Sequence, residues 1–236
     1  MNRHTAVHFS GHDEIAAILG SEILSGARAP GSRMPALDEM FDRFGISRVL
    51  MREVIKTLSA KGMVASKSRV GTYVLESSQW NWFDPEVLAW RVRLGLDRDF
   101  LARLAEMRRA VEPAGAALAA ENHTPEQLED IHAALDAMAA AGNESRSFAN
   151  ADLEFHIAVS AASGNPLFRS FASVVETALA ASFSISSPAD LASAEANVAR
   201  HRAIADAIEA RDSEGAANAM RNVIDDGFTR VAGNWP

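Results

Sequence analysis

The chain has 236 residues, of which 48% are hydrophobic and 23% charged, as in a folded globular protein with room for two modest domains. It contains no cysteine, which excludes disulfide bonds, thiolate metal sites and cysteine nucleophiles. No apolar run approaches the roughly 18 residues of a membrane span, and the N-terminus has no signal-peptide pattern, so we expect a cytoplasmic protein with no membrane partner.

The net charge of −8 argues against a nucleic-acid partner until its distribution is considered. Residues 1–76 hold ten Lys/Arg and eight Asp/Glu, a net of +2, whereas residues 77–236 hold thirteen and twenty-three, a net of −10. A basic module joined to an acidic one indicates a DNA-binding part separated from a part with another task.

The first part reads as three short helices followed by a hairpin. Apolar spacing and turn residues predict helices over 13–24, 37–44 and 48–61 and strands over 63–67 and 71–76. This order is that of a winged helix-turn-helix, which places its recognition helix in the major groove of DNA. We expect it to span residues 12–76.

The third helix carries the candidate DNA contacts. Ser47 is placed to cap its N-terminus, and basic residues every four positions share one face, Arg48, Arg52 and Lys56. The apolar positions are expected on the inner face, Val49, Leu50, Val54, Ile55 and Leu58. The predicted DNA-binding residues of the module are Arg33, Ser47, Arg48, Arg52, Lys67, Arg69 and Gly71. The alternative is a small helical domain whose basic residues serve only solubility.

The remainder is predicted to be entirely helical, so the fold class is mainly α: a winged helix-turn-helix and an all-α bundle of six to seven helices. Residues 77–84 form the expected linker, with Trp80, Trp82 and Trp90 packing it onto the bundle, and residues 85–233 the expected effector-binding and dimerisation domain. Start and stop signals place the helices at 85–94, 98–121, 125–141, 144–163, 166–184, 189–211 and 213–232.

One helix of the bundle carries an acid–histidine pair. Asp152 and His156 are four residues apart and so project from one helical face, where they could hold a divalent ion, with His201 on a later helix as a third ligand. The alternative is that Asp152 bonds locally and His156 is a buried histidine with its hydrogen bonds satisfied.

Several segments of the chain resemble a known family. PGSRMPALDEMFDRFGISRVLMREVIKTLSAKGMV with VGTYV is similar to the DNA-binding domain of GntR-family bacterial transcription regulators. MRRAVEPAGAALAA, ADLEFHIAVSAASGNPLF and HRAIADAIEARDSEGAANAM resemble the FCD effector domain of the FadR-like subfamily. The linker QWNWFDPEVLAW resembles the branch that responds to sugar acids such as galactonate.

The resemblance implies further site residues and two departures. FCD domains that bind metal, zinc or a similar divalent ion, use an aspartate and three histidines, matched here by Asp152, His156 and His201, but the fourth position is Val223. Water or effector oxygens could fill that position, or the pocket could be metal-free. The family's Ser-Glu-Arg after Leu-Pro is replaced by Ala36, Leu37 and Asp38, so one DNA-contacting arginine is absent.

The effector residues are also taken from the resemblance. Arg108 occupies a position where similar domains carry an arginine and would pair an effector carboxylate, the alternative being an ion pair with Glu112. Asn222 would bind effector hydroxyl groups.

The implied function is a homodimeric, ligand-responsive DNA-binding regulator without catalytic residues. It would be a repressor released by a small carboxylate such as a sugar acid, and its operator would be pseudo-palindromic. The alternatives are a metal-dependent enzyme built on a helical bundle, acting on a small carboxylate, and a helical scaffold for other proteins.

Overall fold

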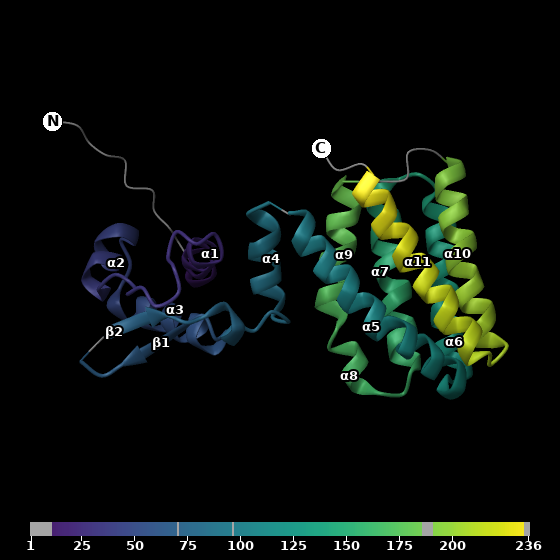
Figure 1. Ribbon diagram of the computed structural model, residues 1–236, viewed down its shortest axis with the longest axis horizontal. Coiled ribbons are helices and arrows are strands. Elements are labelled where there is room, and N and C mark those ends of the chain that lie inside the picture. Colours follow the sequence, from purple (N-terminus) through teal and green to yellow (C-terminus); the bar gives the residue numbers. More distant parts are fainter. Residues whose placement is uncertain (1–10, 70, 96, 186–190, 234–236) are drawn as a thin grey trace. The chain divides into compact units, whose positions relative to one another are not determined.

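The computed structural model describes residues 11–69, 71–95, 97–185 and 191–233; of these, the side chains of 181–185 and Val231 are not described. The chain divides into two compact units, residues 1–95 and 96–236. Their helices and strands are labelled in Figure 1.

The first unit is a winged helix-turn-helix followed by one further helix. Its elements are α1 (His12–Leu24), α2 (Leu37–Phe44), α3 (Arg48–Ala60), β1 (Val64–Lys67), β2 (Gly71–Val74), η1 (Ser77–Gln79) and α4 (Pro85–Arg93). The two strands pair antiparallel in the register Val64↔Val74 to Lys67↔Gly71. The predicted helices and hairpin are thus present, with the strands one or two residues shorter than expected.

Local chemistry accounts for the ends of these helices. Ser47 caps α3 by accepting a hydrogen bond from the backbone N–H of Leu50 at 3.1 Å. Gly62 follows α3 with φ +71 and lies so close to the chain that a Cβ there would stand 2.3 Å from the carbonyl oxygen of Gln79. Only glycine satisfies both conditions, which fixes the turn from α3 into the hairpin.

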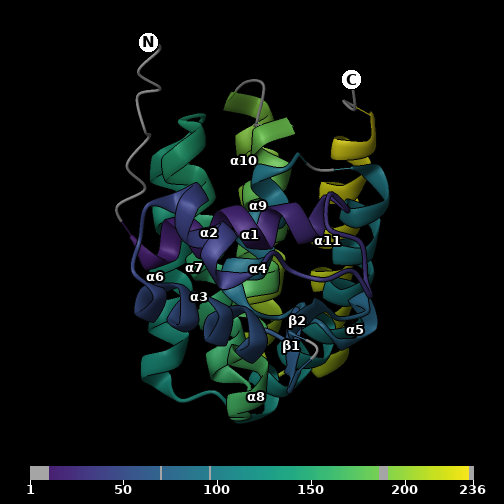
Figure 2. The same cartoon turned by 90° about the vertical axis from the view of Figure 1, so that its left-hand side faces the viewer.

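The boundary between the units differs from the expected one. Helix α4 and the preceding Trp80 belong to the hydrophobic core of the first unit, in which Val87, Trp80 and Trp90 are buried. Helix α1 lies against both α3 and α4 (Figure 2). A tryptophan ring packed on Gly20 leaves no room for a Cβ there, since Cε3 of Trp90 would lie 2.2 Å away. The segment assigned to the linker and the start of the second domain therefore packs with the DNA-binding module.

A buried lysine also ties α4 to α3. Lys61 Nζ lies 2.8 Å from both carboxylate oxygens of Asp84, the N-cap of α4, and 2.7 Å from Glu86 Oε2. Its ammonium group stands over the Trp90 ring at 5.5 Å. Burial alone would lower the pKa of Lys61, but the two carboxylates raise it above its ordinary value.

The second unit is a helical bundle, as predicted. Its helices are α5 (Arg98–Asn122), α6 (Pro125–Ala141), α7 (Ser145–Ala162), α8 (Pro166–Arg169), α9 (Ala172–Ile185), α10 (Leu191–Glu209) and α11 (Ser213–Gly233). The helix expected over 166–184 is divided into α8 and α9. Alanines on α5, α10 and α11 let these helices pack closely around a core centred on Phe148 and Phe155 of α7.

Candidate functional site

The outward face of α3 is charged, as expected for a recognition helix. Arg48, Arg52 and Lys56 are exposed, while the opposite face is buried through Met51, Val54, Ile55 and Leu58. One expectation was wrong: Val49 is 69% exposed and does not line the core. Leu50 is only partly buried. Val49 lies on the face of α3 opposite the buried residues Met51, Val54, Ile55 and Leu58.

Two of the basic side chains on α3 are paired with acids. Arg48 Nη2 lies 2.7 Å from Oδ1 of Asp38, which stands where the resembled family has its arginine. Lys56 pairs with Glu53 at 2.8 Å. Among the described residues no ion pair engages Arg52. All these groups are exposed, so they remain available to another charged partner.

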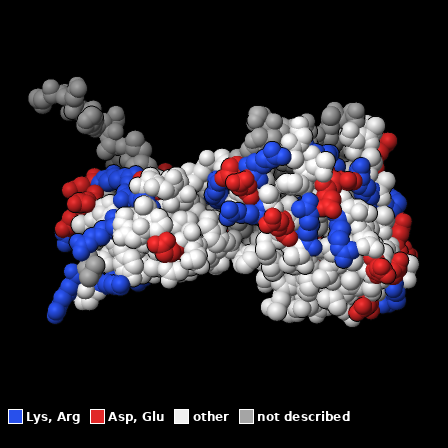
Figure 3. Space-filling view, viewed as in Figure 1, with Lys and Arg blue, Asp and Glu red and all other residues white. Residues whose placement is uncertain are grey.

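The hairpin presents the predicted wing residues at its tip. Lys67, Arg69 and Gly71 are exposed, and the visible charged side chains at this tip are basic (Figure 3). Lys67 Nζ stands over the ring of Tyr73 at 4.9 Å, and Arg69 takes the left-handed backbone conformation with φ +63. A backbone bridge from Arg33 to Tyr73 brings that arginine beside the wing.

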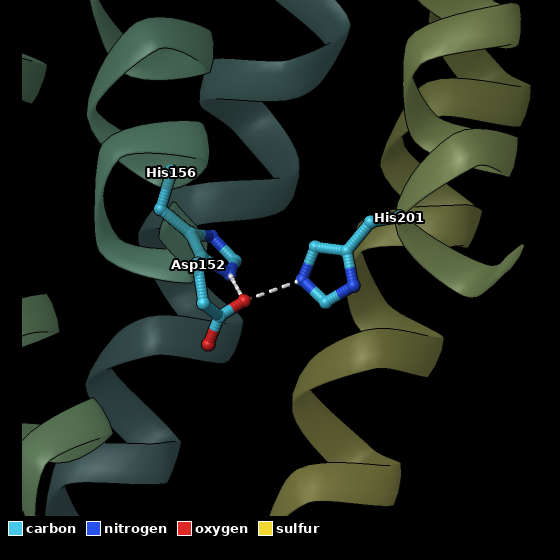
Figure 4. A group of neighbouring side chains, drawn as sticks. All are labelled: Asp152, His156 and His201. Carbon is cyan, nitrogen blue, oxygen red and sulfur yellow. Dashed lines mark ion pairs between the residues drawn. The ribbon is translucent and has the colours of Figure 1, made fainter. Parts of the chain in front are cut away.

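In the second unit, Asp152 and His156 of α7 meet His201 of α10 (Figure 4). All three are buried, and one potential ligand atom from each lies within 4.8 Å of the others. Asp152 Oδ1 is 2.8 Å from His201 Nε2 and 3.7 Å from His156 Nε2. The three residues predicted from spacing and resemblance are thus brought together in one buried cluster.

The hydrogen bonding of His201 fixes its tautomer. Its Nδ1 lies 2.9 Å from the backbone carbonyl oxygen of Asn197, which can only accept, so Nδ1 carries the proton. Nε2 then points at Asp152 Oδ1, and neither atom has a hydrogen bond of acceptable geometry among the described residues. A neutral imidazole nitrogen and a carboxylate oxygen at 2.8 Å repel each other unless a proton or a cation lies between them.

Glu112, expected only as an alternative partner of Arg108, also belongs to this site. It is buried on α5, with Oε2 2.6 Å from His156 Nδ1 and Oε1 2.5 Å from Arg108 Nε. Arg108 Nη2 also lies 3.3 Å from His156 Nε2. The ion pair between Arg108 and Glu112 is therefore present. The signal that could have identified Glu112 is its four-residue spacing from Arg108 on a helix facing α7.

These charges shift one another's pKa values. Burial would raise the pKa of Glu112, but Arg108 and His156 lower it to about 2. Burial would likewise raise the pKa of Asp152, yet His201, His156 and Arg108 hold it below its ordinary value. Arg108 therefore balances part of the negative charge of the two buried carboxylates, and a protonated histidine or a bound cation would balance the rest.

The donor set fits a divalent metal ion. Two imidazole nitrogens and a carboxylate oxygen are ligands that zinc and similar ions prefer, and a tetrahedral zinc ion separates its donors by about 3.4 Å. The separations of 2.8 and 3.7 Å from Asp152 Oδ1 bracket that value. On the far side of the rings, His201 Nδ1 is hydrogen-bonded to the Asn197 carbonyl oxygen, a usual outer partner of a histidine ligand. His156 Nδ1 lies 2.6 Å from Glu112 Oε2, without a hydrogen bond of acceptable geometry. Val223 is buried in the apolar core and offers no fourth donor.

The two effector residues taken from the resemblance differ in their surroundings. Arg108 is buried and lines a small cavity of about 30 Å³ with residues of α5, α9 and α11, among them Ile224 and Phe228. Asn222 is exposed and is not among the residues lining that cavity. Its helical neighbours Val223 and Ile224 face the interior instead.

Comparison with protein families identifies both units. Residues 12–74 match the bacterial regulatory proteins of the gntR family, and residues 103–226 match the FCD domain. The two matches coincide with the winged helix-turn-helix and with the helical bundle that holds Asp152, His156 and His201.

Two relatives of known sequence match over most of the chain. The galactonate operon transcriptional repressor of Escherichia coli is 33% identical over 90% of this chain and 93% of its own. An uncharacterised HTH-type transcriptional regulator of Escherichia coli, YieP, is 33% identical over 89% of this chain and 90% of its own. A solved structure described as Lar, which controls expression of the Listeria monocytogenes agr system, has a TM-score of 0.66 at 17% identity, covering 95% of this chain and 98% of that one.

These matches decide between the classes of function considered above. The family and its relatives are transcription regulators, so the enzyme alternative is not supported. Within the described residues, no helix is long and apolar enough to cross a membrane. The chain belongs to the GntR family of bacterial transcription regulators, in its FadR-like subfamily with an FCD domain, and is a ligand-responsive DNA-binding regulator.

Proposed function

We propose that this regulator is a repressor released from its operator by a small carboxylate of the sugar-acid class. The galactonate operon repressor of Escherichia coli is similar to this chain over 93% of the repressor's length. The linker QWNWFDPEVLAW resembles the branch of the subfamily that responds to sugar acids. An effector can weaken DNA binding only as far as it prefers the conformation that does not bind DNA.

Asp152, His156 and His201 would hold a divalent ion such as zinc in the bundle. The observation that carries this is the short approach of His201 Nε2 to Asp152 Oδ1 without a hydrogen bond of acceptable geometry. The ion would supply positive charge at that point and a place for oxygen ligands. With Val223 at the family's fourth ligand position, oxygens from water or from the effector would complete the coordination.

Arg108 would pair the effector carboxylate, since its guanidinium group lies 3.3 Å from the ligand nitrogen of His156. The cavity beside it, about 30 Å³, is far smaller than the roughly 300–1,000 Å³ of typical small-molecule pockets. Effector entry would therefore displace the side chains of α11 that close the cavity, including Phe228. The effector would therefore bind more tightly to the conformation of the bundle in which these side chains are displaced.

On DNA, two copies of the chain would read a pseudo-palindromic operator, since a two-fold dimer matches a two-fold site. Arg48 and Arg52 would contact the major groove, with Ser47 and Arg33 at the adjoining phosphates. Lys67, Arg69 and the backbone at Gly71 would contact DNA from the wing. The exposure of these residues supports the assignment. Asn222 remains a proposed hydroxyl-binding residue only if the bundle rearranges around it.

The test is thermal melting of the full-length protein with a panel of sugar acids, with and without a chelator. A ligand that binds only the native state raises the melting temperature by mass action. We expect one acid to raise it, the chelator to abolish the rise, and His201→Ala to do the same. The matched control is His132→Ala, which removes a partly exposed histidine near Glu209 and should keep the response.

Each other outcome overturns a defined part of the proposal. A rise that survives both the chelator and His201→Ala excludes the metal and leaves a pocket built on Arg108. No rise with any acid of the panel excludes this effector class. If the protein elutes as a monomer in size-exclusion chromatography, and binds operator DNA as a monomer, the dimer is excluded.

A further inference from the structure

Val49 is an exposed aliphatic residue at the start of the recognition helix. It is the second residue of α3, and 69% of its surface is accessible. At about 100° per residue, its position is roughly opposite the mean direction of the buried residues Met51, Val54, Ile55 and Leu58. Core packing therefore does not explain an apolar side chain here.

The neighbours of Val49 are the residues that face DNA. Arg52 and Glu53 lie one helical turn further along the same face, and Arg48 precedes Val49 directly. All three are exposed, so Val49 forms a single apolar point on a polar surface. In helix-turn-helix proteins the N-terminal residues of the recognition helix contact base edges in the major groove.

We propose that Val49 is a specificity-determining residue that reads the 5-methyl group of a thymine in each half-site. In the major groove, each base pair presents hydrogen-bond donors and acceptors, and the thymine methyl is the one apolar group among them. A valine cannot hydrogen-bond to a base edge, but it can cover that methyl group and exclude water from it. Arg48 and Arg52, on either side, would contact neighbouring bases or phosphates.

The inference rests on DNA binding by the winged helix-turn-helix and is independent of the effector and metal proposed above. It also predicts that the DNA-facing residues of α3 have different roles. The arginines set affinity and register, and Val49 distinguishes thymine from cytosine, which has hydrogen in place of the methyl group. Replacing Val49 should change which base is preferred at one position more than it changes overall affinity.

The first experiment selects binding sites for the full-length protein from a random-sequence DNA pool. The best duplex is then resynthesised with uracil in place of each thymine in turn, which removes only the 5-methyl group. We expect one thymine per half-site whose replacement weakens binding by the wild-type protein about fourfold, the change that corresponds to leaving one methyl group uncovered.

The second experiment repeats the uracil series with Val49→Ala and with Lys67→Ala as matched control. Val49→Ala should bind the thymine and uracil duplexes with equal affinity at that position, because its side chain no longer reaches the methyl group. Lys67→Ala removes a wing charge and should weaken both duplexes while preserving their fourfold difference. Circular dichroism of Val49→Ala should match that of wild type, since the residue is exposed.

The outcomes that overturn the proposal are distinct. A selected site without a thymine under α3, or a wild-type protein indifferent to every uracil, excludes methyl recognition. A fourfold uracil effect that persists unchanged in Val49→Ala assigns the thymine preference to another residue or to DNA shape.

Discussion

Glu112 and His156 form a buried pair in which a carboxylate oxygen of Glu112 lies 2.6 Å from Nδ1 of His156, on the side of the imidazole away from Asp152. This contact orients the ring so that Nε2 faces the cluster with Asp152 and His201. The same carboxylate group binds Arg108. One side chain thus holds both the histidine and the arginine on which the proposed site depends.

Glu112→Gln is expected to weaken zinc binding about 10- to 100-fold, the usual cost of losing the outer partner of a histidine ligand. Competition with a chromophoric chelator measures this affinity directly. Glu106→Gln, a substitution at an exposed position of the same helix, is the control and should leave the affinity unchanged. Equal affinities for the wild type and Glu112→Gln would show that Glu112 does not position His156.

Asp38→Ala is expected to strengthen DNA binding at low salt, because it releases Arg48 and removes a negative charge from the DNA-facing surface. The gain should shrink as the salt concentration rises, because the ion pair with Arg48 and the repulsion of phosphate by Asp38 are both screened. Fluorescence anisotropy on the selected duplex at several NaCl concentrations measures the ratio of the two affinities. A ratio of one at low salt would mean that Asp38 does not oppose DNA binding.

The double substitution Arg48→Ala, Arg52→Ala is expected to abolish specific DNA binding, with a loss of at least about 100-fold for two charged contacts. The melting temperature and the effector response should stay as in the wild type, since both residues are exposed. Arg103→Ala, at an exposed position of α5, provides the control for a general loss of positive charge. Retained affinity in the double variant would contradict the docking of α3 in the major groove.

Glu22→Gln should destabilise the first unit at pH 7 by about 1 kcal/mol, and the difference should vanish in acid. Burial would raise the pKa of Glu22, but Arg43 and Arg28 hold it below its ordinary value. Its stabilisation is therefore present above that ordinary value of 4.5 and is lost as the pH falls through the lower folded-state pKa. Urea unfolding at pH 7 and pH 3 measures the difference, with Asp42→Asn, at an exposed position, as control.

Gly20→Ala should destabilise the first unit by about 1–3 kcal/mol, because the new Cβ would overlap the Trp90 ring. Tryptophan fluorescence suits this measurement, since three of the four tryptophans, Trp80, Trp82 and Trp90, lie in the first unit. Gly227→Ala is the comparison: its Cβ would come no closer than 3.9 Å to another side chain, so it should be neutral or slightly stabilising.

Local rules predicted much of this structure. The cap at Ser47 and the turn at Gly62 depend on chemistry within a few residues, and both formed as expected. The meeting of Asp152, His156 and His201 also followed, from helical spacing and from the family resemblance. The cap and the turn need no knowledge of how distant segments pack, whereas the approach of His201 to Asp152 depends on the packing of α10 against α7 and came from the resemblance.

Features that depend on tertiary packing were less accessible. Val49 has the side chain of a core residue, and only the path of α3 shows that it is exposed. The assignment of α4 to the first unit depends on Trp90 packing against Gly20, seventy positions earlier in the chain. Glu112 became part of the site because α5 lies beside α7, which no local pattern states.

The packing of Trp90 on Gly20 has a practical consequence for building chimeric regulators. A DNA-binding unit cut after residue 76 would lack α4, which packs on the apolar side of α1, and would be prone to aggregate. A cut after Gly95 keeps Lys61 with Asp84 and Trp90 with Gly20 in one piece. The DNA-binding unit that can be fused to another effector domain is therefore the segment that ends at Gly95. Fusions designed at that junction should express as folded protein.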